Sequence, residues 1–231
     1  TYDPCIFRVI MLEQSQYYFL LLILASAVSA YTASLIWKHR TTPGAYAVLS
    51  FTLGMCAWAL TYAIFWAMPS SPNRLFWLNA TYFGVVVVPG SFLVFTLYHT
   101  GRQTLLRGRR RLLLVLLPVI TLILLWTDPW HGLFFAGKQV ADSGTILDGG
   151  FWFWLHVLYS YSLLLICTIL LFQALLRAQR VFRWQAALVL FAGLLPWISN
   201  IISFAGLNPL PGLDLTPLSF TLTGLILTYS L

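Results

Sequence analysis

The residues best suited to binding a small molecule are polar and large aromatic side chains that recur at one end of long apolar segments. They come from five segments. Because alternate segments run in opposite directions, these residues lie at the same depth. The opposite halves of the same segments are mostly aliphatic. Aromatic walls with a few polar groups are typical of pockets for small, mostly apolar molecules. We therefore predict a ligand-binding pocket built from seven residues. They are Tyr62, Trp77, Tyr82, His156, Trp197, Asn200 and Asp214.

Several of these residues also have a purely structural interpretation. Trp58, Tyr62 and Trp66 are spaced by four residues, which places them on one helix face. Such a stripe is more often packing or an interfacial aromatic belt than a pocket wall. A histidine near the end of a segment, such as His156, is often only an interfacial residue. Asn200 could simply form a hydrogen bond between helices, since membrane bundles use amides in this way.

Proline positions indicate where helices begin and bend. Asp214 lies three residues before Pro217, at the start of the last apolar segment, an arrangement typical of a capped helix start. Pro89 and Pro196 lie inside apolar segments and predict kinks, because proline has no backbone N–H and clashes with the preceding turn. A kink frees a backbone carbonyl and can hollow out a bundle, although it can also be merely structural.

The sequence offers no catalytic pattern and no metal site. It contains no His-Glu-x-x-His motif, no nucleophile elbow, no phosphate loop and no paired carboxylates within an apolar segment. No charged residue lies in the middle of a segment, which argues against a pump or ion transporter, and 215–231 lacks the lysine that a retinal protein needs. The cysteines, Cys5, Cys56 and Cys167, have neither metal-ligand nor disulfide-framework spacing. We expect no enzyme activity, metal or cofactor in this chain.

The apolar segments themselves predict an all-α membrane protein, a bundle of seven transmembrane helices. The chain is 60% hydrophobic and 8% charged, whereas globular proteins are about 25% charged. Uncharged apolar runs of about 20 residues are characteristic of membrane-spanning helices. The predicted spans are 14–37, 44–68, 75–99, 112–126, 149–176, 184–205 and 215–231, and together they make 1–231 one seven-helix membrane domain.

The charge distribution predicts the orientation of the bundle. Alternate connectors carry ten of the 13 basic residues and no acid, while the opposite face carries all six acids. The positive-inside rule makes the basic face cytoplasmic, so the N-terminus is outside and the C-terminus inside. The net charge of +7 then reports topology, and a nucleic-acid partner is not expected. The ten residues are Lys38, Arg40, Arg102, Arg107, Arg109, Arg110, Arg111, Arg177, Arg180 and Arg183.

Two further features concern the connectors and the chain end. The long outer connector 127–148 has alternating apolar residues on either side of a turn at 142–144, so we predict a short extracytoplasmic β-hairpin, 133–141 with 145–147, lying over the outer end of the bundle. Leu231 closes the last span without a charged residue after it. We expect a cytoplasmic output domain to follow.

Six short motifs follow one another in a fixed order along the chain. They are TPGA at 42–45 with the Trp58 region, GVVVVP at 84–89, FTLYHTGR at 95–102, TDPWH at 127–131, YSY at 159–161 and DLTPLSF at 214–220. In this order they resemble the N-terminal seven-helix sensor region of bacterial membrane histidine kinases and diguanylate cyclases. The family usually has Asn where Asp128 stands in this chain.

The resemblance implies a receptor module of the bacterial inner membrane that passes a signal through the last span to an output domain in the same chain, such as a kinase or cyclase unit. The ligand would be small, mostly apolar and extracytoplasmic. The other expected partners are the lipid bilayer and, as a further candidate, a second copy of the chain. Two alternatives remain open: a transporter or channel for a small apolar solute, and a membrane anchor with an empty cavity.

Overall fold

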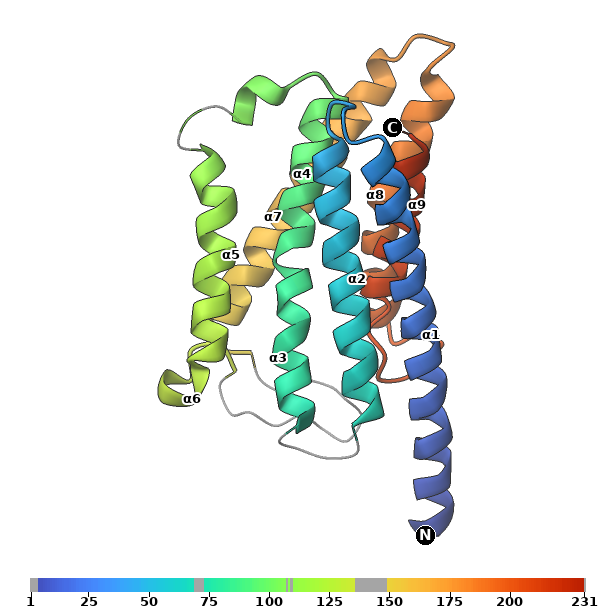
Figure 1. Cartoon of the computed structure of the whole chain (residues 1–231), viewed down its shortest axis with the longest axis vertical. Helices are drawn as coiled ribbons and strands as arrows, with labels where there is room; N and C mark the ends of the chain where they lie inside the picture. The colour runs from blue at the N-terminus through green and yellow to red at the C-terminus, as the bar shows by residue number, and fades with distance from the viewer. Residues whose placement is uncertain (1–3, 69–72, 107, 109, 136–148, 231) are drawn as a thin grey trace.

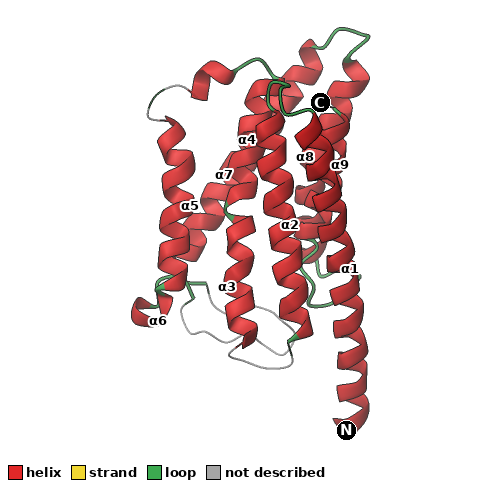
Figure 2. Ribbon diagram, in the orientation of Figure 1, coloured by secondary structure: helices red, strands yellow, loops and turns green. Residues whose placement is uncertain are grey.

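The computed structural model describes residues 4–68, 73–106, 108, 110–135 and 149–230. Within these ranges the chain is helical, with no strand (Figure 2). The elements are α1 (Pro4–Lys38), α2 (Ala45–Ala67), α3 (Asn73–Val85), α4 (Val87–His99), the 3-10 helix η1 (Gln103–Leu106), α5 (Arg110–Trp126), α6 (Asp128–His131), α7 (Phe151–Arg177), α8 (Arg183–Phe204) and α9 (Thr216–Tyr229).

The long helices stand side by side as a bundle in which α3 and α4 follow one another along a single rod (Figure 1). Over the described residues, five stretches are long and apolar enough to cross a membrane: 14–38, 45–67, 73–99, 151–177 and 183–203. The remaining apolar helices are shorter, with 17 residues in α5 and 14 in α9. α2 lies near the centre, packed against α1, α3, α4 and α9.

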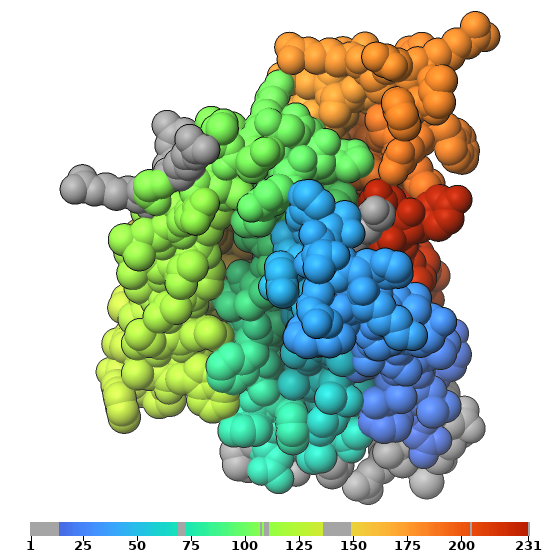
Figure 3. All heavy atoms as spheres, turned by 45° about the horizontal axis from the view of Figure 1, so that its top comes forward, coloured from blue at the N-terminus to red at the C-terminus, as the bar shows by residue number. Residues whose placement is uncertain are grey.

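The connectors separate by charge between the two ends of the bundle. The connectors from α1 to α2, α4 to α5 and α7 to α8 lie at one end, called the basic end, and Figure 3 turns this end toward the viewer. Asp128 in α6 and Asp214 before α9 lie at the other, called the acidic end. This arrangement matches the alternation of the charges along the sequence. The direction of the bundle across the membrane stays a prediction.

Apolar side chains cover the outside of the bundle as well as its interior. On α5 and α7, Val115, Ile123, Leu158 and Leu165 are all exposed. In a soluble protein such surfaces would promote aggregation, whereas in a bilayer they contact acyl chains. Because lipid is as apolar as leucine, the helices are held together by close packing and by hydrogen bonds rather than by the hydrophobic effect.

Two glycines lie at a close contact between α2 and α3. Gly84 of α3 lies against the backbone oxygen of Gly54 in α2, and a Cβ atom at position 84 would also collide with Trp58. Small residues let helix backbones approach in this way. Two residues after Gly84, α3 gives way to α4 at Val86. Pro89 cannot donate a hydrogen bond to the carbonyl of Val85, four residues earlier, which accounts for the interruption.

Two expectations from the sequence need comment. The first helix begins at Pro4 and is longer than the predicted span 14–37. The predicted β-hairpin is not supported: Leu133, Phe134 and Phe135, its described residues, form bends rather than a strand. The remainder of the hairpin, 136–147, lies outside the described residues.

The interior is filled unevenly along the bundle axis. The largest cluster of buried apolar side chains, including Phe51, Phe92, Leu171 and Leu227, packs the half nearer the basic end. The other half contains smaller clusters around Tyr18 and Tyr82. The main packed core therefore lies nearer the basic end, and one cavity lies toward the acidic end.

Candidate functional site

A pocket of about 600 Å³ lies in the acidic half of the bundle. It is bounded by α2, α3, α4, α7, α8 and the first turns of α9, and by the connector between α8 and α9. The volume falls in the range of about 300–1,000 Å³ that is usual for small-molecule sites.

Two continuous helix faces form most of the wall. The lining positions recur with a spacing of three and four residues, which is the period of a helix face. On the rod made by α3 and α4 they are 78, 81, 82, 85, 88 and 89, and on α7 they are 153, 156, 157, 160, 161 and 164. Val85 and Pro89 flank the interruption at Val86, so the break in this rod forms part of the pocket wall.

The structure brings together five of the seven predicted residues. Tyr62, Tyr82, His156, Asn200 and Asp214 line the pocket, each from a different element. Whether they bind a ligand stays a prediction.

The other two predicted residues do not line the pocket. Trp77 packs edge-on against Phe76 and beside the cluster around Tyr18. Trp197 faces α7, where its Nε1 donates to Thr168 Oγ1 at 3.2 Å and its ring meets Tyr161 at 5.4 Å between centroids. Both tryptophans therefore stabilise helix packing.

Asp214 joins the start of α9 to α2. Its backbone N–H donates to the hydroxyl of Tyr62 at 3.2 Å, while its Oδ1 accepts from the backbone N and the Oγ1 of Thr216 at 2.9 and 2.5 Å. The carboxylate thus holds the first turn of α9, as the sequence pattern suggested. The carbonyl of Leu213 cannot accept from the residue four positions later, because Pro217 has no N–H. Asn208 Nδ2 donates to this carbonyl instead, at 2.8 Å.

The electrostatic environment of Asp214 is unusual for a connector residue. The side chain stays accessible through the pocket, yet protein atoms surround it closely. This burial raises the pKa of Asp214 above the ordinary value, against the opposing effect of the hydrogen bonds from Thr216. The charged form is therefore less stable here than in water.

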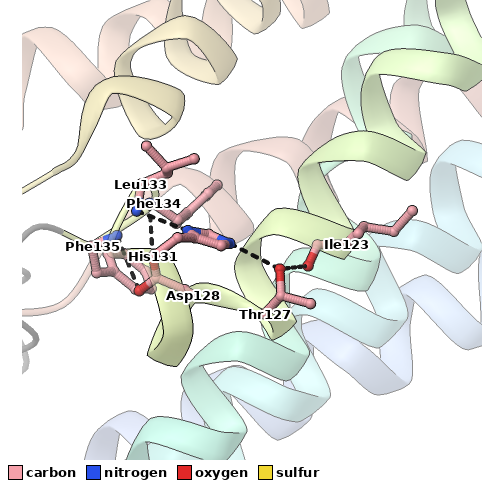
Figure 4. A network of polar contacts seen from close by, with 7 residues as sticks. All are labelled: Ile123, Thr127, Asp128, His131, Leu133, Phe134 and Phe135. Carbon is pink, nitrogen blue, oxygen red and sulfur yellow. Dashed lines mark hydrogen bonds and ion pairs between the residues drawn. The ribbon is translucent and has the colours of Figure 1, made fainter.

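The described part of the long connector supports the wall formed by Tyr82. Asp128 Oδ1 accepts from the backbone N of Phe134 at 2.8 Å and its Oδ2 from that of Phe135 at 3.3 Å (Figure 4). The two phenylalanines are buried and meet Tyr82 at 5.1 and 6.3 Å between ring centroids. His156 lies beyond, 6.1 Å from Tyr82. A carboxylate serves both N–H groups, whereas the asparagine usual in the resembled family would offer one oxygen.

His131 completes this loop through a chain of hydrogen bonds. Its Nδ1 accepts from the backbone N of Leu133 at 3.0 Å, so in the neutral ring Nε2 carries the proton and donates to Thr127 Oγ1 at 2.9 Å. Thr127 in turn donates to the carbonyl of Ile123 at 2.7 Å (Figure 4). The TDPWH motif therefore joins the end of α5 to the following connector by hydrogen bonds, and it lies outside the pocket.

Sequence reasoning missed several pocket residues that look ordinary. Thr81 and Ser203 carry small hydroxyl groups of a kind that occurs throughout membrane helices, and Ser160 and Tyr161 entered the sequence analysis only as part of the YSY motif. The helical spacing from Tyr82 and His156 was the available signal. In the described residues there is no group of three or more side chains suited to holding a metal ion.

Comparison with known families decides the relationship of the chain. The family model described as the N-terminal 7TM region of histidine kinase matches residues 21–231. The chain belongs to this family. Such a region is a membrane-embedded sensory domain of a signalling protein, and it places this chain in the bacterial inner membrane as a multi-pass protein. The comparisons with curated proteins and with solved structures each returned no match.

Proposed function

We propose that this 7TM region is a ligand-sensing receptor domain whose pocket faces the extracytoplasmic side. The carrying observation is that one cavity is bounded by α2, α3, α4, α7 and α8 and also by the start of α9. A ligand in this cavity contacts the start of α9 and also α2 and α8, two of the helices that pack against α9. The ligand is small and mostly apolar, because most of the lining side chains are aromatic or aliphatic.

The signal passes along α9 to an output domain in the same chain. Asp214 fixes the start of α9 to Tyr62 of α2, and Ser199 of α8 donates to Ser219 of α9 at 3.1 Å. A ligand that displaces α2 or α8 therefore acts on α9 directly. A ligand shifts such an equilibrium only by its difference in affinity between two states, and about 1.4 kcal/mol of difference is a tenfold shift.

The test uses the full-length protein in proteoliposomes and compares two serine variants of α7. Ser160 lines the pocket, whereas Ser162 is exposed on the same helix. Ser160→Leu fills the pocket and Ser162→Leu adds the same volume on the outer surface. We expect Ser160→Leu to change the basal activity of the output domain by about fivefold or more, within the usual range of allosteric coupling, and Ser162→Leu to leave it unchanged.

The outcome is interpreted only for variants whose thermal unfolding matches that of the unmodified protein. Equal output activities for the two variants would reject the pocket as the sensory site. A transport function makes a different prediction, namely uptake of a small apolar solute into proteoliposomes by the isolated bundle, blocked by Ser160→Leu.

A further inference from the structure

The pocket carries a negative charge without a positive partner. Among the described residues that line it, Asp214 is the one acidic side chain, and none is lysine or arginine. Asp214 Oδ1 is occupied by Thr216, whereas Oδ2 has no hydrogen-bond partner, and the carboxylate forms no ion pair within the described part of the chain. A carboxylate in such surroundings gains from any cation that enters.

Tyrosines from three different helices line the same pocket as this carboxylate. They are Tyr62 of α2, Tyr82 of α3 and Tyr161 of α7. Tyr62 already accepts from the backbone N of Asp214. The hydroxyls of Tyr82 and Tyr161 have no hydrogen-bond partner among the described residues, although Tyr82 is only 7% exposed. Two lining tyrosines thus have a hydroxyl oxygen that can still accept a hydrogen bond.

The remaining wall supplies aromatic faces. Trp58 and Phe220 meet at 6.2 Å between centroids and line the pocket together with Phe153 and the three tyrosines. Aromatic faces attract cations through the ring quadrupole, most strongly in sites from which water is excluded. A carboxylate beside several such rings is the arrangement that recognises ammonium groups.

Arg74, a described basic residue near this end, interacts with two aromatic rings outside the pocket lining. Arg74 lies over the rings of Phe65 and Trp66, at 4.5 and 5.4 Å, and is not among the pocket-lining residues. At the positive end of the α9 helix dipole, the backbone N of Thr216 already donates to Asp214 Oδ1. An anionic ligand would therefore meet the Asp214 carboxylate without a cation in the lining to balance it.

We propose that the pocket binds a small organic cation, an ammonium group attached to an apolar body, with the ammonium group at Asp214 and the body between the aromatic side chains. This inference rests on the proposed function, because it names the ligand class of the same pocket. It adds a charged head group to the apolar ligand expected from the sequence, and it excludes organic anions.

The test measures binding of three probes of similar size to the purified protein in nanodiscs near neutral pH: 2-phenylethylammonium, 2-phenylethanol and phenylacetate. Isothermal titration calorimetry gives each dissociation constant. We expect the cation to bind about tenfold or more tightly than the alcohol, and phenylacetate to bind weakest. Asp214→Asn keeps the Oδ1 acceptor for Thr216 and removes only the charge. This variant should lose that preference for the cation.

Two variants control for trivial causes. Asp128→Asn also removes one negative charge at the acidic end. Asp128 does not line the pocket and Asn keeps an oxygen for the backbone N of Phe134, so the preference for the cation over the alcohol should persist even where a change in the Tyr82 wall alters the absolute affinities. Tyr82→Phe removes a free hydroxyl while keeping the ring, and we expect a smaller loss of cation affinity than with Asp214→Asn.

The outcomes separate the ligand class from the receptor function. Equal affinity for the three probes, no binding of the cation, or an unchanged preference in Asp214→Asn would overturn the cation assignment. None of these results would test the receptor function itself. That function is tested separately by the output activities of Ser160→Leu and Ser162→Leu, which do not depend on the charge of the ligand.

Discussion

The hydroxyl of Thr223 in α9 donates to the backbone carbonyl of Ala192 in α8 at 2.8 Å. Ala192 lies four residues before Pro196, so within α8 its carbonyl lacks the N–H that normally serves it. Thr223 is fully buried, where water cannot replace that donor. The carbonyl that Pro196 leaves without its usual donor in α8 is thus hydrogen-bonded by α9. This hydrogen bond gives α8 a direct hold on α9, the helix proposed to carry the signal.

Replacing Thr223 with Val should destabilise the bundle by roughly 1 kcal/mol, the usual size of a side-chain hydrogen bond between membrane helices. Val keeps the shape of Thr and removes the hydroxyl. Thr228→Val is the matched control, because Thr228 donates only within α9, to Gly224 at 2.7 Å. Chemical unfolding in mixed micelles measures both variants.

A double-mutant cycle identifies the carbonyl involved. Pro196→Ala returns an N–H that can donate to the carbonyl of Ala192, so in that background Thr223→Val should cost less. If Thr223→Val costs the same with Pro196 or Ala at position 196, the hydroxyl is not compensating for the proline.

Gly84→Ala should be strongly destabilising because its new methyl group would collide with the backbone oxygen of Gly54 and with Trp58. Backbone cannot move aside as a flexible side chain can, so we expect a loss of about 1–3 kcal/mol. Gly90→Ala is the control on the same rod: its nearest neighbour would be the carbonyl oxygen of Leu114 at 3.9 Å, an ordinary contact. A thermal-shift assay in detergent compares them, and similar melting temperatures would mean that α2 and α3 do not cross closely at this point.

The pH dependence of stability should reveal Asp214. Its folded-state pKa is raised by burial, so the charged form is less stable in the empty pocket than in the unfolded chain. The resulting stability is fully present below the ordinary aspartate pKa of about 3.9 and is lost as the pH rises through the raised folded value. Asp214→Asn should flatten the unfolding curve in this acidic range, and an unchanged slope would show that another group causes it.

The other titratable and charged groups around Asp214 are the same in the unmodified protein and in Asp214→Asn. The groups that face it or act on the same side chains are His156, Tyr62, Tyr82 and Tyr161, together with Arg74, which acts on Tyr62. All are present in both proteins. A cationic probe such as 2-phenylethylammonium should bind more weakly as the pH falls and Asp214 becomes protonated, and this dependence should disappear in Asp214→Asn.

The sequence allowed the depth of the pocket residues to be predicted, but not the rotation of each helix. Alternating span direction places Tyr62, His156 and Asn200 near one end without any knowledge of tertiary contacts. Whether a side chain points inward depends on its neighbours. Trp197, at a comparable depth to Asn200, turns toward Thr168 of α7. Trp197 and Asn200 are three residues apart, so their side chains point within about a quarter-turn of each other around α8. The sequence alone therefore could not show which of them lines the pocket.

Long-range partnerships were equally beyond the sequence. Pro196 predicts a freed carbonyl, but nothing near it indicates that Thr223, 27 positions later, supplies the donor. Asp214 could be assigned to the start of a helix from its neighbours, whereas its contact with Tyr62 joins residues 152 positions apart. Spans and caps follow from local chemistry, while these contacts depend on how the helices pack.

Orientation across the membrane is tested by cysteine accessibility. Trp130 in α6 and Val181 between α7 and α8 are 86% and 84% exposed and lie at opposite ends of the bundle. With the native Cys5, Cys56 and Cys167 replaced by Ala, a single cysteine is placed at either position. A membrane-impermeant maleimide added to intact spheroplasts should label Trp130→Cys and spare Val181→Cys, because the basic connectors are retained in the cytoplasm. Both should be labelled once the membrane is permeabilised. Labelling of Val181→Cys alone in intact spheroplasts would reverse the orientation, place the pocket on the cytoplasmic side, and exclude an extracytoplasmic ligand.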